Sequence, residues 1–76
     1  MTPEQCREAR KLLGWTIQRA GVRSGISGLT VRQFESGRRQ TREANVAAIR
    51  TALEAAGVEF IPENGGGGVR LRERAA

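Results

Sequence analysis

The chain has 76 residues and a formal net charge of +5, with thirteen Lys and Arg residues against eight acidic residues, all of them Glu. A chain of this length forms one small domain, and its basic balance favours nucleic acid as a partner before an acidic membrane surface or an acidic protein. The sequence has no His and one Cys, Cys6, which excludes an intrachain disulfide, a zinc cluster and the commonest catalytic base.

The first helix is predicted to open at Thr2 and to end at Gly14. Thr2 is an N-cap, Pro3 takes the first helical position, and Gln5 completes a capping box. Apolar residues at helical spacing form one inward stripe of Cys6, Ala9, Leu12 and Leu13. Trp15 is expected to be a buried corner residue.

Thr16 is expected to cap a second helix over residues 17–24. Gly21 lies inside this helix, where Gly costs about 1 kcal/mol relative to Ala. We expect the compensation to be the close approach of a neighbouring helix.

A third helix is predicted over about residues 28–35, with Ser27 as its N-cap and Gly37 as its C-terminal glycine. Val31 and Phe34 are three positions apart and share an inward face. Arginines follow at the exit of this helix.

The fourth helix is predicted over about residues 42–56, with Thr41 as its cap. Its amphipathic stripe consists of Val46, Ile49, Leu53 and Ala56. Gly57 ends the helix.

Two short strands are predicted at 58–61 and 69–72, joined by a glycine-rich turn. The chain therefore divides into a helical part, 1–57, and a hairpin with a tail, 58–76. Because an isolated hairpin is marginal in water, it either packs on the fourth helix or pairs with the same strands of a second chain. The residues expected in such a homodimer are Val58, Phe60, Ile61, Val69 and Leu71.

Three segments together resemble the lambda-repressor-like, XRE-type helix-turn-helix domains over roughly residues 3–57. They are Leu12-Leu13-Gly14-Trp15-Thr16, Gly25-Ile26-Ser27 and the run from Thr30 to Arg38. The resemblance implies a mainly α fold, a compact four-helix domain followed by a short C-terminal β-hairpin. It makes residues 1–57 a DNA-binding domain whose third helix is the recognition helix.

Site residues follow from the resemblance. The implied base contacts are Gly28, Leu29, Arg32 and Gln33. The implied phosphate contacts are Thr16, Gln18, Ser27, Thr30, Ser36, Arg38, Arg39, Gln40 and Arg42. Arg10 and Glu35 match a structural ion pair of the family.

The chemistry of these residues fits base reading. Gln33 can pair with adenine, Arg32 with guanine, and Leu29 can touch a thymine methyl group. The sequence also departs from the family pattern. Ile17 stands where Gln is common, and Gly28 takes the first outward position of the recognition helix without a side chain to read with.

The function expected first is a sequence-specific, homodimeric transcriptional regulator that binds double-stranded DNA at an inverted repeat. The alternative is the same fold used for protein binding, as in an antiactivator or an antitoxin-like partner. A third option is nonspecific nucleoid or RNA binding. No nucleophile and base are arranged for catalysis, so no enzyme, cofactor, metal or membrane role is expected, and the setting is the cytoplasm of a bacterium.

Overall fold

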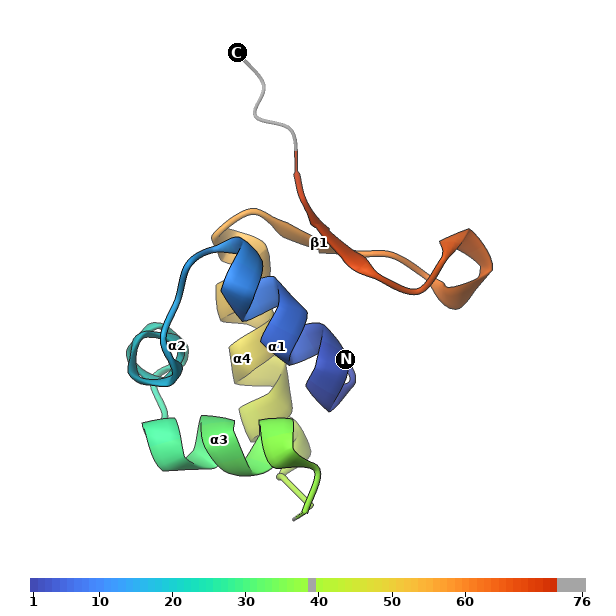
Figure 1. Ribbon diagram of the computed structural model, residues 1–76. Coiled ribbons are helices and arrows are strands. Elements are labelled where there is room, and N and C mark those ends of the chain that lie inside the picture. The colour runs from blue at the N-terminus through green and yellow to red at the C-terminus, as the bar shows by residue number, and fades with distance from the viewer. Residues whose placement is uncertain (39, 73–76) are drawn as a thin grey trace.

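The computed structural model describes residues 1–38 and 40–72 of the chain. In these residues four helices precede a two-stranded antiparallel sheet (Figure 1), which confirms the predicted mainly α fold. The elements are α1 (Pro3–Leu12), α2 (Ile17–Ser24), α3 (Gly28–Ser36), α4 (Glu43–Ala55), β1 (Val58–Phe60), a short 3-10 turn (Glu63–Gly65) and β2 (Val69–Leu71).

The first three helices begin at the caps that the sequence predicts. The side chains of Thr2, Thr16 and Ser27 accept the backbone N–H three residues on, at 3.0–3.1 Å. Gln5 returns the bond to the backbone of Thr2, which completes the capping box. These bonds satisfy N–H groups that have no partner inside the helix.

The start of α4 differs from the prediction. The helix begins at Glu43, its cap position is Arg42 rather than Thr41, and no side chain caps it. Thr41 lies one residue too early in the chain for its hydroxyl to serve the first turn. The helix ends at Ala55, and Gly57 follows with a φ of +105°, a conformation that suits glycine.

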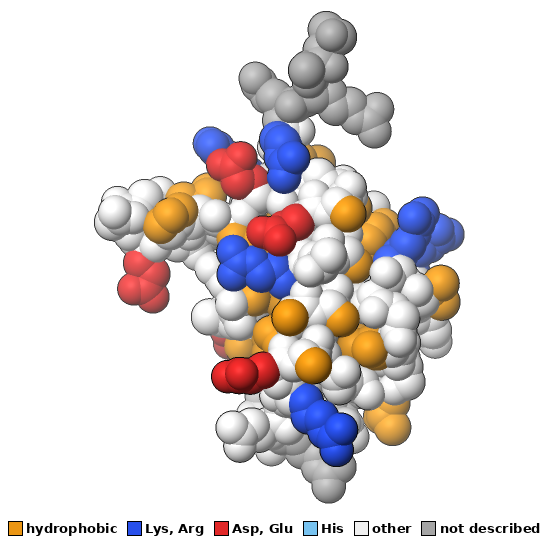
Figure 2. Space-filling model, turned by 180° about the vertical axis from the view of Figure 1, so that it is seen from behind, with side chains coloured by type: hydrophobic (Ala, Val, Ile, Leu, Met, Phe, Trp, Pro, Cys, Tyr) orange, Lys and Arg blue, Asp and Glu red, His pale blue; other side chains and the backbone are white. Residues whose placement is uncertain are grey.

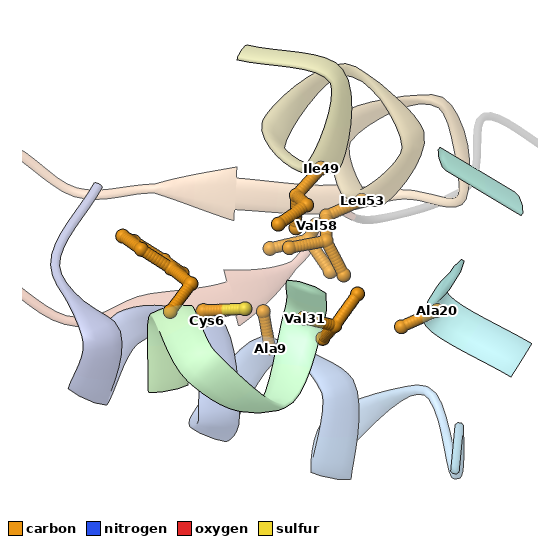
Figure 3. Packing of buried hydrophobic residues seen from close by; sticks show 8 residues of the cluster. Cys6, Ala9, Ala20, Val31, Ile49, Leu53 and Val58 are labelled. Atoms are coloured by element: carbon orange, nitrogen blue, oxygen red, sulfur yellow. The ribbon is translucent and has the colours of Figure 1, made fainter. Parts of the chain in front are cut away.

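The core gathers one or two apolar side chains from each of the four helices and from β1. Figure 3 shows Ile49 and Leu53 of α4 pointing toward Val31 of α3 and Val58 of β1. Cys6 and Ala9 of α1, Ala20 of α2 and Phe34 of α3 complete the cluster. A single core therefore joins the hairpin to the helices.

Two expected core residues lie outside this cluster. Leu12 is 43% exposed, because it projects about 100° around α1 from Leu13, which packs on the core. Ala56 is exposed because α4 has already ended there. Trp15 packs against the core but is only half-buried.

The strands pair with Val58 opposite Leu71 and Phe60 opposite Val69. These four side chains share one face of the hairpin. The hairpin packs on the helices through both strands, since β1 contacts α4 and β2 contacts α1. The expectation that Val58 contacts a second chain is wrong, since its side chain is fully buried in the core of its own protomer.

The hairpin and α3 lie at opposite ends of the molecule, with α1 and α4 between them (Figure 1). From the side opposite to Figure 1, basic side chains are dispersed among acidic and apolar ones (Figure 2). Among the described residues, no helix has the length and apolar character needed to cross a bilayer.

Candidate nucleic-acid interface

The turn between α2 and α3 is packed around Gly21. The N–H of Ile26 donates to the carbonyl of Gly21 at 3.0 Å. A Cβ atom at Gly21 would lie 2.9 Å from both the nitrogen of Gly28 and the carbonyl oxygen of Ile26, closer than real Cβ atoms come. The expected close approach is therefore present, and it holds the start of α3 against α2.

A buried ion pair fixes the inner side of α3 to α1. Glu35 is 6% exposed, and its two carboxylate oxygens accept hydrogen bonds from Nε and Nη2 of Arg10, each at 2.9 Å. Arg10 also donates Nη1 to the carbonyl of Trp15 at 3.0 Å, and Arg7 donates to the carbonyl of Glu35 at 2.9 Å. The hydrogen bond to Glu35 raises the pKa of Arg10 above its ordinary value, although burial opposes the shift.

The thiol of Cys6 lies beside the same carboxylate, with Sγ 3.5 Å from Oε2 of Glu35. Burial raises the pKa of Cys6 from 9.0 to about 12, and the neighbouring charge of Glu35 adds to the shift. The thiol therefore stays protonated at neutral pH and serves as packing and as a weak donor.

Of the four expected base contacts, Leu29, Arg32 and Gln33 lie on the outer side of α3, and Gly28 faces the start of α2. Leu29 is 64% exposed, Arg32 is exposed, and Gly28 and Gln33 are half-buried. Two surface hollows flank this side of the helix. They bring together residues that are far apart in the sequence.

The first hollow, of about 290 Å³, lies between the starts of α2 and α3. It places Gln18, an expected phosphate contact, beside three of the expected base contacts. Its lining is Ile17, Gln18, Gly28, Leu29 and Arg32.

The second hollow, of about 300 Å³, lies between α3 and the start of α4. It joins Gln33 to the loop that precedes α4, and it is lined by Thr30, Gln33, Gln40, Thr41, Arg42 and Asn45. The sequence reasoning missed Asn45 as a candidate. The sequence feature that could have identified Asn45 is an amide side chain in the first turn of α4, away from the apolar stripe.

The expected phosphate contacts that carry a hydroxyl group differ in whether that hydroxyl is already hydrogen-bonded within the chain. Thr16 accepts a backbone N–H as a cap, so its own hydrogen remains available to a phosphate. The hydroxyls of Ser27 and Thr30 bond to each other at 2.9 Å. Ser36 donates to the carbonyl of Gln33 at 2.9 Å, so its hydrogen is already used within the chain.

Among the described residues, three exposed arginines on or just after α3 form no ion pair within the chain. In residues 1–38 and 40–72, the arginines in ion pairs are Arg10, Arg50 and Arg70. The exposed side chains of Arg32, Arg38 and Arg42 are in none of these pairs. Arg39, also expected at a phosphate, lies outside the described residues. Unpaired arginines on one surface favour a polyanion.

Two helices joined by a tight turn, the second anchored on its inner side and exposed on its outer side, have the arrangement of a helix-turn-helix domain. Residues 7–59 match a family model described as helix-turn-helix. The chain belongs to this family, in its lambda-repressor-like, XRE type, as the resemblance implied. This is a family of DNA-binding regulators. A comparison with curated proteins gave no match.

Proposed function

We propose that the protein is a sequence-specific transcriptional regulator that binds an inverted repeat in double-stranded DNA through α3. The observation that carries the proposal is the division of α3 into two sides. Its inner side is held by the ion pair of Glu35, while its outer side offers Leu29, Arg32 and Gln33 between two hollows. A rigid helix with free polar side chains suits the major groove.

Backbone contacts would fix the register of α3 in the groove. Arg38 and Arg42 follow α3 on its exit side, and Thr16 and Gln18 begin α2. Together they can reach phosphates on both sides of the groove, which positions the protein without reading sequence. The protein would then act on the nucleoid, in the cytoplasm.

We further propose a homodimer formed through the edge of β2. The N–H of Arg72 bonds to Gly57 and that of Ile61 to Gly68. Because bonded and non-bonded pairs alternate in an antiparallel ladder, the main-chain groups of Val69 and Leu71 point away from β1. A second β2 can pair with them.

The surface beside this edge supports the homodimer. A hollow of about 330 Å³ between α1 and β2 is lined by Glu8, Lys11, Leu12 and Val69. One acidic and one basic residue in the same patch can each meet the opposite charge across a two-fold axis. Arg70 is already paired with Glu59 at 2.6 Å, which reduces repulsion between the two edges.

The test is a titration, by fluorescence anisotropy, against DNA from upstream of the protein's own gene and against scrambled DNA of equal length. We expect a preference of about a thousandfold for the upstream DNA. Equal, salt-sensitive binding to both would leave a backbone binder and contradict the proposal.

Two kinds of variant distinguish base contacts, which read the DNA sequence, from phosphate contacts, which position the protein. Gln33→Ala and Arg32→Ala should reduce the preference between the two DNAs. Arg38→Ala should weaken binding to both and lower the salt slope by about one unit. The matched control is Arg50→Ala, which removes a charge that lies over Phe60, beside the hairpin.

A second candidate function rests on two exposed apolar residues, one on α2 and one on α3. Val22 is 79% exposed and Leu29 is 64% exposed, and both would suit a protein partner. Failure to bind either DNA at low salt would favour this candidate.

A further inference from the structure

The hollow between the starts of α2 and α3 is unusual for a surface that meets a polyanion, because apolar groups form much of it. Gly28 lies on the side of α3 that faces α2. A Cβ atom there would be 3.5 Å from Cγ2 of Ile17 and 3.6 Å from Cα of Gln18. Because Gly28 has no Cβ atom, the γ-methyl of Ile17 remains uncovered on the side that faces Gly28.

Rigid neighbours hold this hollow in shape. Ile17 is the first residue of α2 and packs against the core, and Gly28 is the first residue of α3. Each follows a residue whose side chain caps its helix, Thr16 or Ser27. The close contact at Gly21 fixes the two helix starts relative to each other.

The rim of the hollow indicates what enters it. Leu29 stands on one side with 64% of its surface exposed, and Arg32 and Gln18 supply a charge and an amide. Within the major groove, the apolar group that bases present is the C5 methyl of thymine, beside polar base edges and phosphates. An apolar floor with a polar, basic rim matches this combination.

We propose that the hollow is a thymine subsite, in which Ile17, Gly28 and Leu29 receive the C5 methyl group. The proposal rests on the proposed function and names one base that α3 reads. Gly28 then contributes to specificity by lacking a side chain, and Ile17 contributes as the floor. Arg32 and Gln18 face the neighbouring base edge and phosphate.

The experiment uses the full chain and the tightest duplex selected from a random DNA library. Each thymine is replaced in turn by uracil, which removes only the methyl group. At one thymine in a half-site, we expect affinity to fall about fourfold, the effect of leaving one methyl group unburied. At that position, 5-methylcytosine should bind about fourfold tighter than cytosine, because it carries the same methyl group.

Gly28→Ala is the decisive variant. Its Cβ would make ordinary contact with Cγ2 of Ile17, so the fold should be kept while the γ-methyl at the floor of the hollow is covered. We expect the ratio of the affinity for the thymine duplex to the affinity for the uracil duplex to fall to about one. The melting temperature of the variant should be no lower than that of the unchanged protein. Leu29→Ala should also reduce the ratio. The matched control is Val22→Ala, which truncates an exposed side chain outside the hollow and should leave the ratio unchanged.

Three results would overturn the subsite. One is equal affinity for thymine and uracil at every position of a sequence that is still preferred, which leaves the proposed function intact. Another is a uracil effect that persists in Gly28→Ala. The last is the absence of any preferred sequence, which removes the proposed function as well and leaves the hollow to an apolar side chain of a protein partner.

Discussion

At the residue scale, Glu35 is a charged side chain enclosed by the helices that it joins. Removing Arg10 would leave its carboxylate buried without two charge-assisted hydrogen bonds. We expect Arg10→Ala to lower the free energy of unfolding by about 3–5 kcal/mol, measured by urea denaturation.

The control for this variant is the exposed ion pair of Arg50 and Glu54, at 3.3 Å in α4. Arg50→Ala should cost less than about 1 kcal/mol, because water solvates both charges. Equal losses for the two variants would contradict a structural role for the Arg10 pair.

Cys6 provides a pH-dependent prediction at the same scale. Its pKa is about 12 in the folded chain against 9.0 ordinarily, so above pH 9 the unfolded chain loses a proton that the folded chain keeps. The stabilisation is complete below pH 9 and is lost as the pH rises toward 12, by up to about 1.4 kcal/mol per pH unit. Urea denaturation in reductant at pH 7 to 10 measures this slope. In Cys6→Ala the slope should be smaller, and parallel curves for the two proteins would refute the prediction.

At the element scale, two glycines of the helix-turn-helix should respond in opposite ways to the same substitution. Gly21→Ala places a Cβ 2.9 Å from two backbone atoms of the turn, so it should destabilise the fold by about 1–3 kcal/mol. Gly28→Ala meets Ile17 at 3.5 Å and should be neutral or stabilising by up to about 1 kcal/mol. Thermal melting by circular dichroism compares them, and equal effects would argue against the tight turn.

At the scale of the whole molecule, the proposed homodimer would use the end opposite α3 and leave the DNA surface free. We expect a dimer at tens of micromolar by sedimentation or light scattering. Leu71→Asp should give a monomer of unchanged helical content, because Leu71 is 49% exposed at the edge of β2. Val22→Asp, at an exposed position on α2, should remain dimeric. A monomeric unchanged protein would remove the homodimer.

The sequence by itself determined the family, the helix count in the described residues and most helix ends. It could do so because caps and terminal glycines act through bonds between residues only a few positions apart, as at Thr2, Thr16, Ser27 and Gly37. The positions of Leu29 and Arg32 on the outer side of α3 follow from the same helical periodicity.

Only the tertiary structure decided which residues meet. It placed Val58 in the core, left Leu12 on the surface, and joined Asn45 to Gln33 in one hollow. It also turned Gly28, which the sequence marks only as a missing side chain, into part of an apolar hollow with Ile17. Burial and surface shape depend on how elements distant in the chain pack together, and local hydrogen bonding does not specify that packing.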